Sequence, residues 1–544
     1  MPSLLRRAFD VSLRSLGSRS PRSPALSILT TTTAIVAIAA LAVASASFVA
    51  GCAPAGPVVG RVLDPWIVKS WPVSDWIASD RAATAISPDG AYMLLVQAGP
   101  EERVVKAVPL APENANEIRL YEVDNTYLEK SSLDLEVIGW ISETECAFLA
   151  AGWQYRGPNE GRYGIGVLTA DIETGACEEM AFIPLSEEHV QRFTYLPESG
   201  QLSLEVTGAV WSVDMKGKIA RPVTGGLPTN NLFPASVSPD ASAYIYERHE
   251  VDGENGLYML DTSTGALTPF ALNGDTMDFY ASWSPDGQYV ATYSVAWLPG
   301  KKGATWMKYA IYPGGDGPMP VATHIVVRNR AGQTINNISL DGKVLANFRW
   351  SPDSKSIAFA VAPKPDNNVD AEVDWRIPEL LWDSIYVARV LEPGEPSKVA
   401  DIVTDWPRDA LYIFPIAFDP DSKGVYYQVS EVTGQSEIWY AAPCKTPVQP
   451  EDGTPLKVTD GDWLPYPELP TYGNSLAALI GHRSGKTELW LLSSQGATKV
   501  DEWPGSYTMV IAFNEDTLVT CEIAGESKNK ITVRSMYTNK EVSG

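Results

Sequence analysis

The residues that could carry out chemistry are few and widely spaced in this 544-residue sequence. A zinc site usually draws on His or Cys side chains at short spacing, but no two histidines stand at i, i+4 and no Cys-x-x-Cys occurs. A hydrolase nucleophile on an elbow needs Gly-x-Ser-x-Gly, which is absent as well. The sequence therefore predicts no metal, no cofactor and no linear catalytic motif. The histidines are His189, His249, His324 and His482.

Carboxylates are abundant in this acidic chain, so their presence alone singles out no catalytic pair. The stretch 419–424 reads D-P-D-S-K-G and superficially resembles a calcium loop. A calcium loop of that kind ends on a Glu ligand, which is missing here. We therefore interpret this stretch as a tight turn between strands.

Five cysteines are spread along the chain, beginning with Cys52. Cys146 and Cys177 fall on strands that a third strand should separate, about 10 Å apart, which exceeds the reach of a disulfide. Cys444 and Cys521 would have to join two different structural units. We expect these last four cysteines to be unpaired.

A short stretch, Ala281 to Ser294, shows which elements must position any site. It reads A-S-W-S-P-D-G-Q-Y-V-A-T-Y-S. Ser284-Pro285-Asp286-Gly287 fits a type I turn, because Pro presets φ, Asp bonds nearby backbone and Gly accepts the left-handed position that follows. The residues after the turn alternate in the manner of a strand.

The same turn between strands returns along the chain, with its acidic residue recurring every 42 to 68 residues. Recurrence at about 40–50 residues is typical of propeller blades, each of about four strands. We predict an all-β chain, a β-propeller of four-stranded antiparallel blades, with eight blades favoured in a range of seven to nine. Close copies span 85–96, 236–246, 349–359 and 417–427, and weaker copies begin near Trp140, Tyr195, Gly473 and Ala512.

From about Ala82 onward these copies resemble the TolB-type propeller repeat, a WD40-like (PD40) repeat whose core reads W-S-P-D-G-x-x-I-A-F. The resemblance implies architecture and says little about function. The family includes periplasmic and surface binding propellers, and also the propeller half of prolyl-oligopeptidase-like peptidases. No βαβ pattern follows the repeats here, so we do not expect the hydrolase half.

Four units depart from the repeat, and the enlargement falls in the predicted connection between second and third strands. Such connections emerge on the same face of a propeller, so enlarged, aromatic-rich loops there predict a recognition surface. The alternative is that the loops pack on one another as a cap. The enlarged stretches are 99–117, 152–162, 297–320 and 363–381, and the candidate binding residues are Trp153, Tyr155, Trp297, Trp306, Tyr309, Tyr312 and Trp375.

Residues 1–51 have the layout of a secretory signal, with five arginines followed by the apolar run Ala25 to Val49. The run is also long enough for a plain membrane-spanning anchor. Val49-Ala50-Gly51-Cys52 resembles a bacterial lipobox, which implies that Cys52 becomes the mature N-terminus and carries the lipid, including palmitate. The resemblance implies a lipid-anchored protein on the extracytoplasmic side of the cell membrane.

The net charge of the chain is −24, and the leader contributes +4 from five Arg and one Asp, which leaves −28 for the rest. Such acidity favours solubility and argues against a nucleic-acid partner, whose phosphates need a basic face. It also argues against a protein that lies flat on anionic lipid.

Residues 52–80 are expected to hold the lipidated N-terminus, a Pro/Gly-rich linker and a strand near Arg61 to Val68, ahead of a propeller over 81–544. The last repeat has clear strands near 507–513, 518–523 and 530–536 and few residues left for a fourth. We predict that the 61–68 stretch completes that blade. A simple extended tether is the alternative.

Three functions remain open at this point, and the third is a sensor or assembly factor acting with a partner complex in the envelope, which rests on the TolB resemblance alone. The first is a monomeric envelope lipoprotein that binds or scaffolds a protein, a peptide or a glycan, with the membrane engaged through lipid alone. The second is an enzyme, a glycan hydrolase or lyase with acidic residues at the central funnel. Converging carboxylates or a histidine at the channel mouth would favour the enzyme. The missing catalytic motifs favour the binding module.

Overall fold

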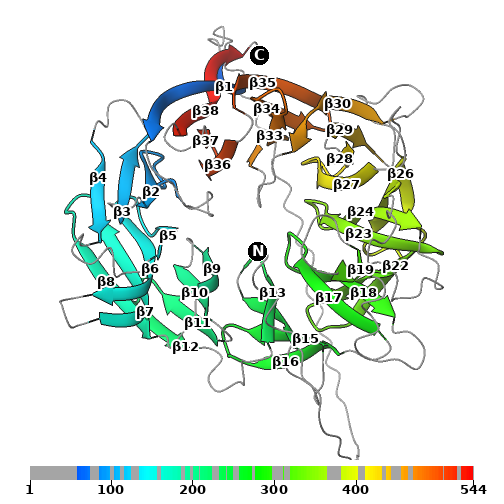
Figure 1. Cartoon of the computed structure of the whole chain (residues 1–544), viewed down its shortest axis with the longest axis horizontal. Helices are drawn as coiled ribbons and strands as arrows, with labels where there is room; N and C mark the ends of the chain where they lie inside the picture. Colours follow the sequence, from blue (N-terminus) through cyan, green and yellow to red (C-terminus); the bar gives the residue numbers. More distant parts are fainter. Residues whose placement is uncertain are drawn as a thin grey trace, which may run out of the picture.

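Nine small antiparallel sheets follow one another around a central opening and form a closed ring (Figure 1). The computed structural model describes most of residues 58–542 and leaves out 1–57, 543–544 and connecting segments, the longest being 74–84, 124–133, 297–309, 364–381 and 443–454. The protein is therefore an all-β, nine-bladed propeller. Nine lies within the predicted range of seven to nine and is one more than the eight favoured from the repeats.

Each blade is one sheet whose strands run in chain order from the opening to the rim, and we number the blades 1 to 9 (Figure 1). In blade 1 a bridge between Ile86 and Met93 takes the place of the inner strand. Blade 1 holds β2 Tyr92–Ala98, β3 Arg103–Pro109 and β4 Ile118–Glu122; blade 2 holds β5 Asp134–Trp140, β6 Glu145–Tyr155, β7 Gly161–Asp171 and β8 Cys177–Pro184; blade 3 holds β9 Val190–Leu196, β10 Gln201–Val206, β11 Ala209–Asp214 and β12 Ile219–Pro222; blade 4 holds β13 Leu232–Val237, β14 Ala243–Arg248, β15 Gly256–Asp261 and β16 Leu267–Leu272.

The remaining blades follow the same plan, with one addition in blade 5. There a small pair, β19 Ala310–Ile311 and β20 Met319–Pro320, lies between the second and third strands. Blade 5 holds β17 Thr276–Trp283, β18 Tyr289–Ala296, β21 His324–Asn329 and β22 Thr334–Ser339; blade 6 holds β23 Lys343–Trp350, β24 Ser356–Pro363, β25 Ser384–Arg389 and β26 Ser397–Asp401; blade 7 holds β27 Leu411–Phe418, β28 Val425–Glu431, β29 Ser436–Ala441 and β30 Leu456–Asp460; blade 8 holds β31 Asp462–Trp463, β32 Thr471–Tyr472, β33 Ser475–His482, β34 Lys486–Ser493 and β35 Gly496–Pro504; blade 9 holds β36 Thr508–Phe513, β37 Thr517–Glu522 and β38 Asn529–Val542.

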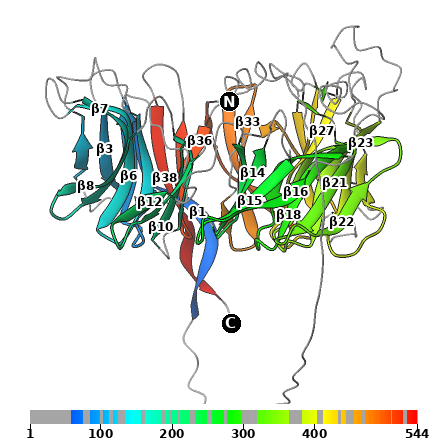
Figure 2. The ribbon, with the colours of Figure 1, turned by 90° about the horizontal axis from the view of Figure 1, so that it is seen from below.

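Blade 9 takes its fourth, outermost strand from the other end of the chain. β1 Val58–Val73 pairs antiparallel with β38, and the 61–68 stretch predicted to close the ring lies inside it. β37 stops pairing with β38 at Ser535, whereas β1 continues to Val542. The two strands therefore leave the ring together as a ribbon on one face (Figure 2).

The two faces of the ring carry different connections. We call the face with the first-to-second and third-to-fourth connections the turn face, and the opposite one the loop face. The ribbon of β1 and β38 leaves from the turn face, because β37 begins there, directly after the turn at Asn514. The repeated Ser-Pro-Asp turns lie on this face as well.

Each residue of the repeated turn has a local task. In blade 5 the Ser284 hydroxyl donates to the Asp286 carboxylate at 2.6 Å and accepts the Tyr289 N–H at 2.9 Å, and the Gly287 N–H closes the turn on the Ser284 carbonyl. Gly287 has φ +66°, which glycine adopts without strain. The same Ser-to-Asp bond is present in blades 1, 4 and 6.

Blades 7 and 9 build the turn from other residues. In blade 7 Asp419 replaces the Ser, and its buried carboxylate accepts the Gly424 N–H and the Tyr440 hydroxyl, each at 2.7 Å. This arrangement explains the D-P-D-S-K-G stretch as a repeat turn. In blade 9 the Asn514 side chain accepts the N–H groups of Asp516 and Thr517.

A hydrophobic cluster fills each of the nine interfaces between neighbouring blades, counted over the described residues. The cluster that closes the ring packs Met93 and Leu95 of blade 1 against Val519 and Ile531 of blade 9. Full burial of one such side chain contributes roughly 1.5–3 kcal/mol. The wedge-to-wedge packing is therefore the main source of stability for the ring.

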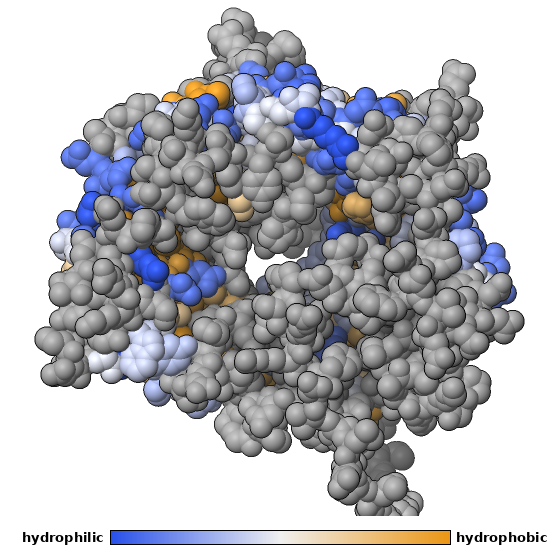
Figure 3. Space-filling view, in the orientation of Figure 1, coloured by the Kyte–Doolittle hydropathy of each residue, from blue (hydrophilic) through white to orange (hydrophobic). Residues whose placement is uncertain are grey.

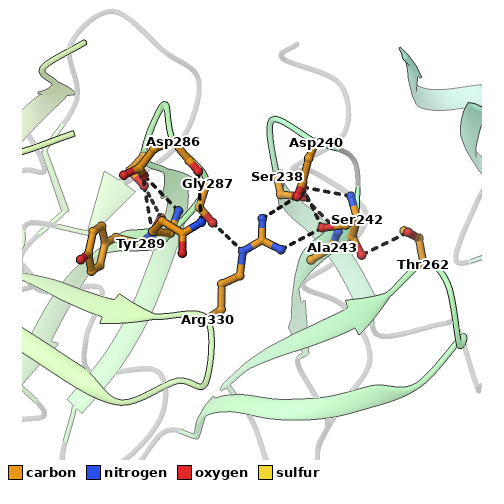
Figure 4. Close-up of polar contacts among 11 residues, drawn as sticks. Ser238, Asp240, Ser242, Ala243, Thr262, Asp286, Gly287, Tyr289 and Arg330 are labelled. Atoms are coloured by element: carbon orange, nitrogen blue, oxygen red, sulfur yellow. Dashed lines mark hydrogen bonds and ion pairs between the residues drawn. The ribbon is translucent and has the colours of Figure 1, made fainter. Parts of the chain in front are cut away.

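Hydrogen bonds link neighbouring turns along the turn face. Arg330, between β21 and β22, donates to the Gly287 carbonyl at 2.6 Å, to the Ser242 hydroxyl at 2.8 Å and to the Asp240 carboxylate at 2.9 Å (Figure 4). One guanidinium thus joins the turns of blades 4 and 5. Partial burial alone would raise the pKa of Asp240, but hydrogen bonds from Ser238, Ser242 and Arg330 lower it below its usual range.

In blades 6 and 7 a serine side chain links each turn to the turn of the preceding blade. Ser354 and Ser422 occupy the position of Gly287 in their turns, with φ of 60° and 58°. The Ser354 hydroxyl accepts the N–H of Asp286 at 3.0 Å, and the Ser422 hydroxyl accepts the N–H of Asp353 at 3.1 Å. The strain of each left-handed serine is offset by a bond to the preceding blade.

Candidate functional site

Of the seven aromatic residues predicted to bind a ligand, the structure describes the side chain of one. Trp153 lies on β6, is 43% exposed, and its ring centroid is 5.5 Å from that of Tyr163 on β7. Tyr155 ends β6, and its side chain lies outside the described part of the molecule. Cys52 lies outside the described residues too, as do Trp297, Trp306, Tyr309, Tyr312 and Trp375.

Two of the four predicted enlargements lie where the sequence indicated. In blade 5 the connection runs from Ala296 to His324, and in blade 6 it runs from Pro363 to Ser384. Both join a second strand to a third, so both leave the ring on the loop face. Blades 5 and 6 therefore share a departure from the repeat.

The other two predicted enlargements are wrong, because a strand or a hairpin runs through each of them. In blade 1 residues 103–109 form β3, so only 99–102 connect the second and third strands. In blade 2, β6 continues to Tyr155 and β7 begins at Gly161, so the predicted loop is largely a long hairpin. The hairpin extends past the last β5 pair, Asp134 with Ala151, and carries Trp153 beyond the body of the sheet.

Blades 5 and 6 also depart from the other blades in the backbone of their inner strands. The inner strands of blades 2, 4, 7 and 9 contain a β-bulge as well. In blades 5 and 6 two residues of the inner strand face one residue of the next strand. The bulges place Tyr280 at φ 52° and Asn347 at φ 51°, the only non-glycine residues with positive φ inside a described strand. A bulky residue in this region is strained, and such strain gathers at functional sites.

Tyr280 is held at the bulge of β17 and remains 48% exposed. Its N–H, freed from the sheet by the bulge, donates to the Glu247 carboxylate of blade 4 at 2.9 Å. Its ring lies edge-on to that of Tyr293, with centroids 6.2 Å apart. Partial burial and the Glu247 charge raise the pKa of the Tyr280 hydroxyl.

The bulge of β23 repeats this arrangement one blade further on. The Phe348 N–H donates to the Tyr293 hydroxyl of blade 5 at 2.9 Å, so Tyr293 has the place in blade 6 that Glu247 has in blade 5. Burial raises the pKa of Tyr293, while the Phe348 N–H and the Arg349 charge oppose the rise. Tyr293 therefore lies between the two bulges and contacts both.

Arg349 and Asn347 present polar groups on the inner strand of blade 6. Both are exposed, with the buried Phe348 between them. Arg349 donates from Nε to the Ile416 carbonyl of blade 7 at 3.3 Å and from Nη1 to the Phe348 carbonyl at 3.2 Å. Among the described residues it has no carboxylate partner. We call Tyr280, Asn347 and Arg349 the inner-rim site.

The inner-rim site belongs to β17 and β23, the strands of blades 5 and 6 nearest to the central opening (Figure 1). The opening is also present in the space-filling view (Figure 3). The site combines a tyrosine ring and hydroxyl, an amide and a guanidinium, groups that suit recognition of a polar ligand.

Sequence reasoning missed these three residues. Tyr280 precedes A-S-W-S-P-D and Asn347 precedes F-R-W-S-P-D. Their shared position, three residues before the Trp, is a weak signal, because positive φ in a non-glycine residue comes from the tertiary structure. The long connections of the same two blades were the stronger pointer to this part of the ring.

The buried carboxylates among the described residues, those of Asp278, Asp419, Glu437 and Glu488, each have a structural partner. Asp278 on the inner strand of blade 5 pairs with the buried Arg328 at 2.6 Å. Partial burial alone would raise the pKa of Glu488, but hydrogen bonds from Lys486 and Trp490 lower it to about 2. Within the described part of the chain, no three His, Cys, Asp or Glu side chains gather as a metal site.

The described cysteines are free. Cys146 and Cys177 lie on β6 and β8 with Ala170 of β7 between them, as the sequence predicts, and Cys521 is buried on β37. Cys444 lies outside the described residues. The part of the chain that the structure describes contains no helix long and apolar enough to cross a membrane.

No known protein family and no curated protein matches the sequence. Solved structures resemble it at low identity. A eukaryotic initiation factor is 12% identical with TM-score 0.42, over 80% of this chain and 89% of that one. The tricorn protease is 12% identical with TM-score 0.36, over 84% and 44%. An oligogalacturonate lyase from Vibrio parahaemolyticus is 12% identical with TM-score 0.33, over 72% and 99%. These likenesses concern the propeller fold alone.

Proposed function

We propose that this chain is a cell-envelope lipoprotein whose propeller binds a protein, a peptide or a glycan without transforming it. One observation carries the proposal. The strand nearest to Cys52 leaves the ring on the turn face, and the enlarged connections of blades 5 and 6 leave on the loop face. An anchor at Cys52 would then hold the turn face toward the membrane and present the loop face outward.

The length of the linker fits this orientation. Cys52 stands six residues before Val58, the first residue of β1. Six extended residues span about 20 Å, and the ribbon of β1 and β38 adds further distance between ring and bilayer (Figure 2). The proposed location is the extracytoplasmic side of the cell membrane, as the lipobox resemblance implies.

The proposed partner class follows from charge and surface. A net charge of −28 after the leader disfavours nucleic acid. Exposed aromatic residues such as Trp153 and Tyr280 offer contact area to a sugar ring or a peptide. We propose a monomer, since the outermost strand position of blade 9 is filled by the chain's own β1.

Labelling with a palmitate analogue tests the anchor. The full chain expressed in a bacterium should incorporate the label and partition with membranes, whereas Cys52→Ala should lose the label and leave the membrane fraction. Unlabelled wild-type protein would refute the lipid anchor. Equal labelling of the variant would refute Cys52 as its site.

Affinity capture from envelope extracts tests the binding role. A variant with 364–381 replaced by a short Gly/Ser linker should lose partners that the wild type retains. The exposed turn-face variant Lys355→Ala serves as the matched control and should keep them. Identical partner sets for wild type and loop variant would contradict recognition by the loop face.

A further inference from the structure

We infer that the inner-rim site binds a carboxylate group of the ligand, with Arg349 as its anchor and Tyr280 as the adjoining platform. The inference rests on the proposed binding function and names the ligand chemistry for it. Its starting point is that blades 5 and 6 depart from the repeat twice, in the non-glycine residues at positive φ within the bulges of their inner strands and in their long connections.

Two of the three guanidinium nitrogens of Arg349 donate hydrogen bonds, which fix the orientation of the group. Its Nε and Nη1 groups are fixed by the carbonyls of Ile416 and Phe348. Nη2 makes no hydrogen bond within the described part of the chain, and the residue is exposed. A guanidinium held in this way keeps donors available in a fixed plane, which matches the geometry of a carboxylate.

The surroundings favour a carboxylate over a phosphate. The site offers one guanidinium in a chain with 66 acidic and 42 basic residues. A doubly charged phosphate would meet stronger repulsion from this field and usually needs several cations or a backbone nest. A singly charged, planar carboxylate needs one guanidinium.

Tyr280 gives the ligand a surface next to the charge. Its ring lies edge-on to that of Tyr293, and the Tyr293 hydroxyl accepts the N–H of Phe348, the residue before Arg349. Tyr293 therefore connects the Tyr280 ring to the strand that carries Arg349. A sugar ring or a peptide side chain next to the carboxylate could pack on Tyr280.

The charges around the site also determine the orientation in which a ligand would bind. Glu247 lies on the blade 4 side of Tyr280, and Arg349 reaches toward blade 7. The carboxylate end therefore belongs at Arg349, and an uncharged polar end belongs toward Glu247. Asn347, exposed and without a side-chain hydrogen bond among the described residues, supplies a donor and an acceptor beside Arg349.

Changing the ligand rather than the protein gives the cleanest test. Two probe pairs are titrated calorimetrically into the full chain in detergent, an acetylated pentapeptide with a free C-terminus against its amide, and a hexuronic acid trisaccharide against its methyl ester. At least one acid should bind about tenfold more tightly than its neutral form. The pair that shows the difference identifies peptide or glycan as the source of the carboxylate.

Three variants tie the effect to the site. Arg349→Gln should reduce the acid-to-neutral ratio to within about twofold, because the term that distinguishes the probes is lost. Asn347→Gly should weaken binding of the acid several-fold with an unchanged melting temperature, since glycine suits positive φ. Tyr280→Gly should weaken binding of both the acid and its neutral form, because it removes the ring on which either would pack. If Arg349→Gln does not fold, these two variants and the probe pairs still decide the question.

Several outcomes would overturn the inference. They are equal binding of acid and neutral probes, a tenfold preference that survives Arg349→Gln, and no binding of any probe up to ~10 mM, the limit of weak affinity. Envelope partners captured equally by Arg349→Gln and wild type would remove the inference and leave the proposed function intact. If the variant with 364–381 replaced loses its partners while Arg349→Gln keeps them, the inference likewise fails and the proposed function stands.

Discussion

The turn face and the inner-rim site both contain non-glycine residues at positive φ, but they use them differently. On the turn face the hydroxyls of Ser354 and Ser422 each accept a backbone N–H from the preceding blade. At the inner rim Asn347 has the same backbone strain, is exposed, and makes no side-chain hydrogen bond among the described residues.

The difference is therefore between a strained backbone whose side chain makes a hydrogen bond to the preceding blade and a strained backbone whose side chain makes none among the described residues. A left-handed residue costs roughly 1–2 kcal/mol, somewhat less for Asn, and an inter-blade hydrogen bond returns about 1 kcal/mol. The turn face therefore comes close to balance within the protein. At the inner rim the backbone N–H groups of Tyr280 and Phe348 bond side chains of the preceding blade, but the side chain of Asn347 makes no hydrogen bond among the described residues. A strained residue with an unused polar side chain is the pattern expected where a ligand supplies the missing bond.

The largest effect is expected from Arg330, which joins the turns of blades 4 and 5. Arg330→Ala removes three hydrogen bonds and should lower the free energy of unfolding by about 2 kcal/mol. Urea unfolding measures the change, with Lys355→Ala as the exposed control on the same face. A loss no larger than that of the control would show that the linked turns do not stabilise the ring.

A pair of changes at Ser422 separates strain from bonding. Ser422→Ala keeps the strained backbone and loses the acceptor for the Asp353 N–H, so it should cost about 1 kcal/mol. Ser422→Gly loses the same bond but relieves the backbone, so its stability should stay within about 0.5 kcal/mol of wild type. Equal losses for Ala and Gly would contradict the strain at this position.

The matching pair at Asn347 should behave differently. Asn347→Gly should change the free energy of unfolding by less than about 0.5 kcal/mol, and Asn347→Ala should lower it by about 0.5–1 kcal/mol. Thermal and urea unfolding both measure this. A loss above about 1.5 kcal/mol for Asn347→Gly would show that the side chain supports the fold, and the contrast with Ser422 would fail.

The smallest effect is a pH dependence at Asp240. Its folded pKa is depressed, so its contribution is present above the ordinary carboxyl pKa of about 3.9 and is lost as pH falls toward the folded value. Asp240→Asn should therefore lose less stability than wild type on acidification below pH ~4. Parallel pH profiles for the two proteins would rule out this contribution.

The fold could be predicted because the repeated turn is locally determined. Ser284, Asp286 and Gly287 bond one another inside five residues, so the letters alone indicate the turn. The favoured blade number was one too low because blades 8 and 9 replace these letters. Blade 8 turns at Gly473 between β32 and β33, and blade 9 uses Asn514.

The site was less accessible to sequence reasoning. The 99–117 stretch was predicted as a loop although Val104, Val105 and Val108 belong to a buried strand, since insertion was inferred from spacing between turns. Tyr280 and Asn347 owe their positions to bulges whose freed N–H groups bond side chains one blade away. Such partners are far apart in sequence, so no local pattern indicates them.

Hydrogen exchange of the protein with and without a captured envelope partner tests the central claim most directly. The account predicts that a bound partner protects residues 276–283 and 343–350, the inner strands of blades 5 and 6, and leaves the Ser-Pro-Asp turns unchanged. Protection confined to turns such as 284–288 and 351–355, with the inner strands unaffected, would contradict it.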